Sequence, residues 1–364
     1  MIFSKKVNTK CPYFTICGGC QYQDLKYESQ LEIKKKKLEE IFVKEKLISK
    51  IEIVPSKEIY SYRNKVDIPI TNKGIGFKKK GSWSEIVEIE SCDIFGDNLK
   101  KIIFSLRKFM KDFNLSPWDL KNHSGFMRYI VVREGKFTED IMINIITSEG
   151  CLPEEVKDYF KATSIHWCVN DKITDISVGK VKKFWGEKYI KEKLNGIYYF
   201  VGPNSFFQSN PFVTEEIIKY VSNLVSFKKV LDAYCGVGTF SLYLAKMGKE
   251  VEAFDNNHES IEIAKENSIY NGLKVNFFVA DDKTVKNFEC ESLIVDPPRA
   301  GLHPNFIKTI KKITPKEIIY VSCNPLSLKE NIIKLNKYKI INLMAFDMFP
   351  QTEHIECVAK LIKK

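Results

Sequence analysis

Cys323 is the side chain in this sequence with the clearest capacity for covalent chemistry. It stands in the segment EIIYVSCNP (317–325), directly after an apolar run. Such a run, followed by a Pro-containing turn, predicts a buried strand that presents its last side chains at the edge of a sheet. Ligands of α/β sheets bind at that edge. A lone free cysteine is more often a small buried apolar residue, so the other residues of the chain must decide between the two interpretations.

Acidic side chains end other strand-like runs of the C-terminal half. Asp255 ends EVEAFD, Asp281 and Asp282 end VNFFVADD, and Asp296 follows SLIV. A carboxylate after the second strand, here Asp255, accepts hydrogen bonds from a ribose diol in nucleotide-binding sheets, and Asp281-Asp282 is a candidate for contacting the edge of an adenine ring. Each acid taken singly fits a cap or a turn. Their repetition at successive strand ends predicts one shared binding edge.

The turn after the run VLDA (230–233) is rich in glycine. Gly236 and Gly238 permit a tight turn and a close approach of the backbone to a ligand, and Thr239 leads into a helix. The third glycine of a dinucleotide fingerprint is missing. The turn therefore favours a smaller nucleoside ligand.

Glu356 is an isolated acid within the last strand-like run, at 355–361. A glutamate among apolar residues of a strand is costly to bury unless it is paired or used. The position is therefore a candidate for function as well as for an ion pair.

A second group of reactive residues lies near the N-terminus. Cys11, Cys17 and Cys20 stand in CPYFTICGGC, whose glycines allow a tight fold, and Cys92 is the candidate fourth ligand. All-sulfur ligation suits an iron–sulfur cluster or a structural zinc ion. The spacing differs from the Cys-x-x-x-Cys-x-x-Cys of radical enzymes. Chance grouping among ten cysteines is the alternative interpretation.

The elements that must position these residues fall into two sets. A chain of 364 residues suits about two domains. Residues 1–200 combine helical segments with short β-like runs and predict an α+β domain with the metal site. Residues 201–364 repeat a strand–loop–helix unit and predict a Rossmann-like, doubly wound parallel sheet.

Composition and charge indicate the class of partner. The formal charge is +11, with 44% hydrophobic and 28% charged residues, so we expect folded domains and a polyanionic partner. The basic runs Lys34–Lys37 and Lys78–Lys80, the latter with Trp83 close by, are either solvated surfaces or RNA contacts. No segment is typical of a signal peptide or a membrane span. We therefore expect a cytoplasmic protein without a membrane partner, acting as a monomer.

Several of these motifs, taken in order, resemble those of the enzymes that make 5-methyluridine in RNA from S-adenosylmethionine. The segments SFFQSNP, LDAYCGVGTF, IVDPPRAG, VSCNP and FPQTEHIE are similar to the successive motifs of that family's catalytic domain. The cysteines of CPYFTICGGC with Cys92 resemble the 4Fe–4S site of its 23S ribosomal RNA branch. The resemblance covers nearly the whole chain and implies an N-terminal iron–sulfur and RNA-recognition domain before an S-adenosylmethionine-dependent methyltransferase domain.

The resemblance also implies roles for individual residues. Cys323 would be the nucleophile that adds to C6 of uracil, Glu356 the base that removes the C5 proton, and Asp296 a residue that orients the nucleobase or relays a proton. Phe206 and Pro297 would enclose a flipped uracil. The residues expected to contact the methyl donor are Gln208, Tyr234, Gly236, Gly238, Thr239, Asp255, Asp281 and Asp296. The family often has Glu at the position of Asp255, and some members have Asn at that of Thr239.

The expected activity is therefore C5-methylation of a specific uridine in 23S ribosomal RNA. Transfer RNA is the alternative substrate, because some cluster-bearing relatives modify it. An RNA-binding assembly protein without activity is a further alternative, which the presence of Cys323, Asp296 and Glu356 disfavours. For the cysteines, a zinc ion is the alternative to the cluster.

Overall fold

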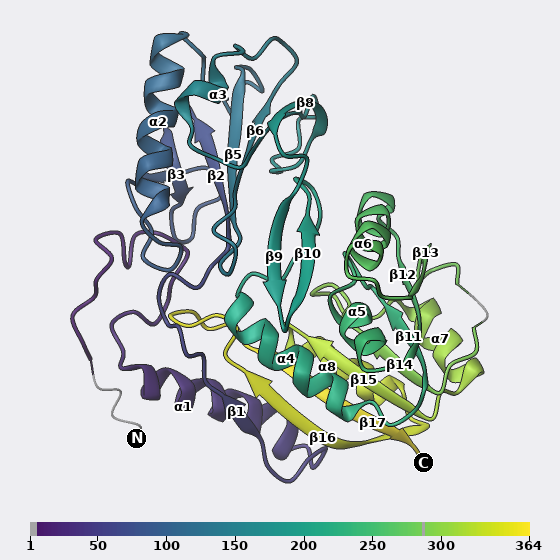
Figure 1. Cartoon of the computed structure of the whole chain (residues 1–364). Helices are drawn as coiled ribbons and strands as arrows, with labels where there is room; N and C mark the ends of the chain where they lie inside the picture. The colour runs from purple at the N-terminus through teal and green to yellow at the C-terminus, as the bar shows by residue number, and fades with distance from the viewer. Residues whose placement is uncertain (1–5, 286–287) are drawn as a thin grey trace.

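The computed structural model describes residues 6–285 and 288–364, and it contains two large β-sheets (Figure 1). A two-stranded hairpin of β9 (Ile190–Leu194) and β10 (Ile197–Val201) runs between the two lobes that these sheets form. The lobe drawn at the top of Figure 1 belongs to residues of the first half of the chain. The lower lobe holds most of the C-terminal half.

The C-terminal sheet has eight strands in the order β1-β16-β17-β15-β14-β11-β12-β13. Strand β17 is antiparallel to both of its neighbours, and the other pairs are parallel. The predicted doubly wound, Rossmann-like α/β arrangement is confirmed. The strands are β1 (Glu52–Val54), β11 (Lys229–Ala233), β12 (Glu250–Asp255), β13 (Asn276–Val279), β14 (Ser292–Val295), β15 (Glu317–Ser322), β16 (Tyr338–Phe346) and β17 (Glu356–Lys363).

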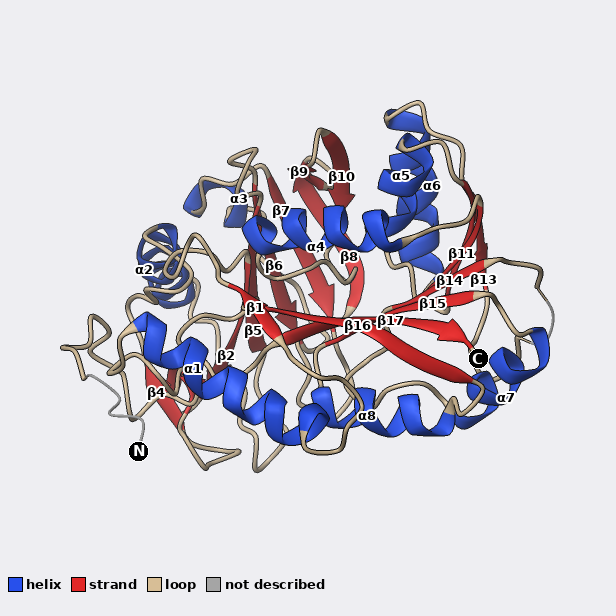
Figure 2. Cartoon of the chain, turned by 90° about the horizontal axis from the view of Figure 1, so that it is seen from below, coloured by secondary structure: helices blue, strands red, loops and turns tan. Residues whose placement is uncertain are grey.

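Helices cover both faces of this sheet (Figure 2). One face carries α4 (Pro211–Leu224), α5 (Thr239–Lys246) and α6 (His258–Tyr270). The other carries α7 (Pro304–Ile313), α8 (Pro325–Lys334), α1 (Tyr27–Leu38) and the π-helical turn η1 (Glu39–Val43). Each face buries its own apolar core, which is why the central strands β14 and β15 are buried along their whole length.

Local sequence signals begin several of these helices. The Asn210 and Asn324 side chains accept hydrogen bonds from the first-turn N–H groups of α4 and α8, and a proline follows each cap. The Asn257 side chain caps α6 in the same way. These caps fix where each strand-to-helix loop ends, and two of those loops carry candidate site residues.

The N-terminal lobe is built on a seven-stranded sheet with the order β4-β3-β2-β5-β6-β7-β8. The helices α2 (Asn98–Asp112) and α3 (Val156–Tyr159) pack on one face of it. The strands are β2 (Lys65–Thr71), β3 (Gly74–Lys78), β4 (Ile86–Glu88), β5 (Met127–Glu134), β6 (Ile141–Thr147), β7 (Ser164–Val169) and β8 (Lys180–Gly186).

Residues 6–60 are shared between the two lobes. Helix α1 and strand β1 come from the predicted N-terminal domain, yet β1 pairs with β16 and α1 packs on the C-terminal sheet. Sequence periodicity gave no sign of this long-range pairing. The domain boundary at residue 200 therefore stays a proposal, because residues 27–54 precede it and yet contribute to the C-terminal lobe.

The basic run at Lys34–Lys37 was offered as an RNA contact, and for Lys34 this is wrong. Its side chain is 0% exposed and forms an ion pair with Asp347. The helix presents Lys34 on the same side as its apolar residues, toward the sheet. Among the described residues, we find no helix with the length and apolarity that a membrane span needs.

Candidate active site

One edge of the C-terminal sheet gathers most of the candidate residues. Parallel strands β11, β12, β14 and β15 all end at this edge, and the antiparallel strand β17 begins there. Tyr234, Asp255, Asp296 and Cys323 directly follow or end the four parallel strands, and Glu356 is the first residue of β17. The predicted shared edge is confirmed.

Cys323 and Glu356 face each other across β15 and β17. The last register pair of the two strands is Ser322 with Cys357, so Cys323 directly follows the end of β15 where Glu356 begins β17, and the Glu356 charge acts on the Cys323 thiol. Burial and the neighbouring Asp296 charge raise the pKa of Glu356, which is 4% exposed, well above its ordinary range. Burial, aided by the negative Glu356, raises the pKa of the Cys323 thiol to about 11. Both shifts thus favour the protonated forms of the two groups.

Asp296 lies between this pair and the loop at 202–210. Gln208 Nε2 donates a hydrogen bond to Asp296 Oδ2 at 3.0 Å. Burial raises the pKa of Asp296 to about 7, and the Gln208 hydrogen bond opposes part of that rise. Two residues expected to contact the methyl donor are thus held against each other.

The loop at 202–210 presents Phe206 outward. That ring is 65% exposed, although it lies between two buried residues of the loop, while Pro297 is buried. The N-terminal lobe fixes the loop, since Arg133 Nη2 donates to Ser205 O at 2.6 Å and Asn64 Nδ2 donates to Gln208 O at 2.9 Å. The exposed Phe206 ring is therefore carried by a loop whose backbone is fixed by hydrogen bonds from the N-terminal lobe.

The glycine-rich turn after β11 forms the next part of the edge. Gly236 and Gly238 have φ of 54° and 91°, and Tyr234 has φ of 66°, in the region that favours glycine. The Gly236 N–H donates to Asp255 Oδ2 at 3.0 Å, and Thr239 begins helix α5. The turn thus joins the end of β11 to the acid that ends β12, as the sequence predicted for a nucleoside-binding edge.

The two adjacent acids after β13 differ in their contacts. Asp282 accepts a hydrogen bond from the Tyr234 hydroxyl at 2.6 Å. Asp281 Oδ1 instead accepts from the Lys283 N–H at 2.8 Å, within its own turn. Asp282 is therefore the acid joined to the predicted donor residues, and Asp281 stays a prediction.

Two charged residues of the edge were not singled out from the sequence. The Arg299 guanidinium lies near enough to Cys323 to oppose the rise in the thiol pKa. The backbone carbonyl oxygen of Arg299 accepts a hydrogen bond from Asn324 Nδ2 at 3.0 Å. Asp232 is fully buried, and burial raises its pKa to about 7. The run DPPRAG (296–301) contained Arg299, but only its proximity to Cys323 in space singles it out.

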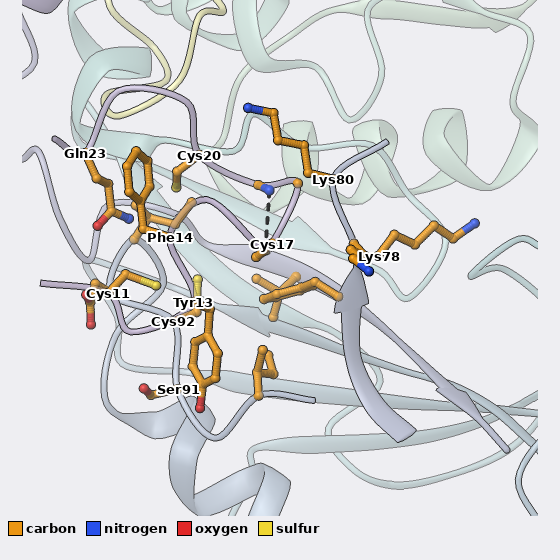
Figure 3. Close-up of a pocket in the computed structure, with 18 of the residues that line it drawn as sticks. Cys11, Tyr13, Phe14, Cys17, Cys20, Gln23, Lys78, Lys80, Ser91 and Cys92 are labelled. Atoms are coloured by element: carbon orange, nitrogen blue, oxygen red, sulfur yellow. Dashed lines mark hydrogen bonds between the residues drawn. The ribbon is translucent and has the colours of Figure 1, made fainter. Parts of the chain in front are cut away.

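The four N-terminal cysteines line one cavity of about 380 Å³ (Figure 3). Pairing with the β3–β4 hairpin holds the Cys17 segment in place, since the Gly18 N–H donates to Lys78 O at 3.1 Å and the Lys80 N–H donates to Ile16 O at 2.8 Å. Burial raises the pKa of the Cys20 and Cys92 thiols to about 11 and about 12. The sequence-distant Cys92 is thus brought to the other three.

The cysteine cavity does not have the geometry of a single-ion site. In the part of the chain that the structure describes, no three Cys, His, Asp or Glu residues lie close enough to hold one metal ion. A tetrahedral zinc site needs four ligands within about 2.3 Å of one point. The four thiols of a 4Fe–4S cluster bind at separate iron atoms and stand farther apart. The described residues therefore do not show the metal site that the sequence predicted.

Lys78 and Lys79, two of the three basic residues at the β3–β4 turn, form ion pairs. Lys78 pairs with Asp175 at 2.6 Å and Lys79 with Glu85 at 2.8 Å. Trp83 on the same turn is 74% exposed. The proposal that this turn contacts RNA rests on Lys80 and Trp83 more than on the paired lysines.

Comparison with known proteins gives matches along the chain. A family model described as tRNA (Uracil-5-)-methyltransferase matches residues 269–364, and one described as Methyltransferase small domain matches residues 214–316. The chain is 45% identical, over 98% of its length and 85% of the relative's, to the tRNA (uracil(54)-C(5))-methyltransferase of Pyrococcus furiosus. It is 40% identical, over 99% of its length and 87% of the relative's, to the 23S rRNA (uracil(747)-C(5))-methyltransferase of Pyrococcus abyssi.

A solved structure resembles both lobes. The tRNA (uracil-54, C5)-methyltransferase of Pyrococcus abyssi, in complex with S-adenosyl-L-homocysteine, superposes with a TM-score of 0.87 and 43% identity. The alignment covers 95% of this chain and 86% of that one. The similarity therefore extends through the cysteine-bearing lobe as well as the parallel sheet.

Proposed function

The chain belongs to the RNA uracil-C5 methyltransferase family, and from that premise we propose that it transfers the methyl group of S-adenosylmethionine to C5 of a uridine in transfer RNA. The observation that carries the proposal is the pairing of Cys323 with Glu356 at the edge that also holds the glycine turn and Asp255. A nucleophile, a base and a nucleoside-binding turn thus meet at one place.

Transfer RNA is the proposed substrate because of the relatives. Those named for uracil 54 of transfer RNA are 44–45% identical to this chain, and those named for uracil 747 of 23S ribosomal RNA are 35–40% identical. The sequence alone favoured ribosomal RNA on account of the four cysteines. Ribosomal RNA remains the second candidate, since both groups match nearly the full chain.

The methyl donor fits the glycine turn and the acids around it. Asp255 would accept the ribose hydroxyls, Gly236 and Gly238 would let the backbone approach, and Asp282 with Tyr234 would line the nucleoside. When bound, S-adenosylmethionine supplies an electrophilic methyl group. Gln208 and Asp296 would lie on the side of the donor that faces the target base.

The Cys323 thiolate activates a uracil that is otherwise a poor carbon nucleophile. Sγ attacks C6, the Sγ–C6 bond forms, and the electron pair of the C5–C6 double bond moves onto the base as an enolate. C5 of that enolate would take the methyl group, and the electron pair of the broken S–CH3 bond would stay on the donor sulfur, which leaves as S-adenosylhomocysteine. The positive charge of Arg299 favours the thiolate, against the burial that disfavours it.

The Glu356 carboxylate completes the cycle. It accepts the proton from C5, the electron pair returns to form the C5–C6 double bond, and the Sγ–C6 bond breaks to release Cys323 as thiolate. A carboxyl whose pKa is raised by burial binds this proton more strongly than an exposed one would. The target uridine must leave its stack to reach Cys323, and Phe206 and Pro297 would enclose it.

We also propose that Cys11, Cys17, Cys20 and Cys92 hold a 4Fe–4S cluster. The support is the convergence of four thiols from two distant segments on one cavity. The cluster would cross-link the N-terminal segment to the lobe that carries Cys92. Iron and sulfide analysis and a visible spectrum after anaerobic purification test this; a colourless protein with one equivalent of zinc would contradict it.

Methylation of defined RNAs tests the proposed function. The purified protein is incubated with S-adenosylmethionine and either an unmodified transfer RNA transcript or a 23S fragment, and nucleosides are identified by mass spectrometry. We expect 5-methyluridine in the transfer RNA, and none with Cys323→Ala. Product in the ribosomal fragment alone would move the substrate to the second candidate. Product in neither RNA, from a folded and donor-bound protein, would reject the proposal.

A further inference from the structure

The segment that leads into Glu356 is held by residues from the opposite end of the chain. This segment, residues 347–355 and here named the base loop, connects β16 to β17 and has no strand or helix of its own. Glu356 follows it directly. The path of the base loop therefore decides where β17 begins and where the Glu356 carboxylate points.

A buried ion pair fixes the start of the base loop. Lys34 Nζ lies 2.5 Å from Asp347 Oδ1, and both side chains are 0% exposed. The same ammonium donates to Phe349 O at 3.0 Å. Lys34 comes from the middle of α1, so one helix residue contacts both a side chain and the backbone of the loop.

A second set of contacts fixes the middle of the base loop. Gln30 Nε2 donates to Gln351 Oε1 at 2.9 Å, and Gln30 Oε1 accepts the Gln351 N–H at 2.9 Å. The N–H groups of Gln21 and Tyr22 both donate to Gln351 O at 2.9 Å. Gln351 has φ of 69°, a conformation that a non-glycine residue keeps only where its surroundings enforce it.

These contacts do not belong to the hydrophobic packing of α1. Two other groups also hold the loop, since the Tyr62 hydroxyl donates to Pro350 O and Asn210 Nδ2 donates to Met348 O, each at 3.0 Å. The loop is thus hydrogen-bonded on several sides by residues of other segments. Helix α1 supplies a buried charge to it, the Lys34 ammonium.

We propose that Lys34 and Gln30 are positioning residues for the catalytic base, acting on Glu356 through the base loop. The proposal rests on the proposed function, in which Glu356 removes the C5 proton after Cys323 has bonded to C6. A misplacement of about 1 Å can cost about 10²-fold in rate. Disturbing the loop should therefore slow the proton-removal step and leave the earlier attack by Cys323 intact.

The test measures which step slows. Lys34→Met alone would leave the Asp347 carboxylate buried and unpaired, which destabilises a fold, whereas removing both charges is often tolerated. We therefore choose the double variant Lys34→Met/Asp347→Leu, with Gln30→Leu as an independent second variant. Glu32→Gln, at an exposed position of the same helix, is the matched control.

We expect both variants to unfold near the wild-type temperature, to keep the wild-type KM for RNA, and to lose about 10- to 100-fold in kcat. With RNA and donor they should accumulate a denaturation-resistant protein–RNA adduct that already carries the methyl group, as Glu356→Gln should. Glu32→Gln should do neither.

Three results would overturn the proposal. A wild-type kcat in both variants would show that the base loop keeps its conformation without these contacts from α1. A lower kcat with no adduct, while Glu356→Gln gives one, would show a merely structural role for Lys34 and Gln30. If Glu356→Gln itself gave no adduct, both the positioning role and the covalent mechanism would be overturned. Of the three results, this one places the failure in the proposed mechanism.

Discussion

Cys323 and Glu356 stand opposite each other because β17 runs antiparallel to β15. The register ends with the pair Ser322 and Cys357, which leaves Cys323 just after the end of β15 and Glu356 at the start of β17. In an all-parallel sheet, the end of β15 would have no strand beginning beside it. The reversed strand β17 therefore puts the start of one strand next to the end of another, which brings together two residues 33 positions apart, as the proposed attack at C6 and proton removal at C5 require.

Replacing Glu356 by Gln should trap the methylated RNA on the protein. Gln is close to Glu in size but cannot accept the C5 proton, so turnover should fall by roughly 10²–10⁴-fold while attack by Cys323 continues. Denaturing electrophoresis with labelled RNA would show the adduct. The matched control Cys323→Ala should show none, and a labelled band with Cys323→Ala would contradict the assigned nucleophile.

Activity should rise with pH between about 6 and 9. Burial raises the pKa of Asp296 to about 7 and of Cys323 to about 11, and raises that of Glu356 as well. The raised pKa values favour the protonated forms at the low end of this range, whereas the mechanism needs thiolate and carboxylate, so deprotonation favours catalysis. Single-turnover rates across this range would measure the rise. A rate that falls steadily over the same range would contradict it.

Glu356→Gln should also stabilise the fold at alkaline pH. The pKa of Glu356 is raised on folding above its ordinary 4.5, so the folded protein holds the proton more tightly than the unfolded chain. That contribution to stability is fully present below pH 4.5 and is lost as pH rises through the folded pKa. The Glu356→Gln variant has no titratable side chain at this position, so it does not lose this contribution to stability as the pH rises. Thermal unfolding at pH 5 and pH 8.5 should therefore show a larger advantage for the variant at pH 8.5; an equal difference at both would argue against a raised pKa.

Asp255→Ala should weaken binding of the methyl donor. The carboxylate accepts the Gly236 N–H at 3.0 Å and is proposed to accept the ribose hydroxyls, so both the turn and the ligand lose a charged acceptor. A loss of about 10- to 100-fold in affinity for S-adenosylhomocysteine is expected, in line with about 1.5–3 kcal/mol for such hydrogen bonds. Calorimetry would measure it. Glu252→Ala, an exposed acid of the same strand, should bind normally.

Phe206→Ala should weaken RNA binding and leave donor binding unchanged. The ring is 65% exposed on a loop that the N-terminal lobe holds in place, and stacking of a base on an aromatic ring contributes about 1–3 kcal/mol. KM for RNA should rise accordingly. Phe104, which is 72% exposed on α2, gives the control Phe104→Ala. An equal effect from both variants would show that neither ring acts through a specific base contact.

Short-range patterns in the sequence predicted much of the fold and many of the residues at the candidate edge. Strand-then-turn patterns placed Asp255, Asp296 and Cys323 at strand ends, and in a parallel sheet all such ends lie on one side. The Gly236–Gly238 turn and the Asn-Pro starts of α4 and α8 are local signals of the same kind. Periodicity and turn chemistry determine such features because neighbouring residues alone produce them.

The contacts between distant segments followed from the tertiary structure alone. The sequence offered Lys34 as a surface cation, and packing buried it against Asp347. The sequence offered no basis for choosing between the adjacent acids Asp281 and Asp282. In the structure, Asp282 accepts a hydrogen bond from the Tyr234 hydroxyl, whereas Asp281 accepts one within its own turn. Pairing across some 300 positions leaves no periodic trace, because its energy comes from burial and charge neutralisation between surfaces that meet only on folding. The sequence determined which groups react; the fold decided what holds Glu356 beside Cys323.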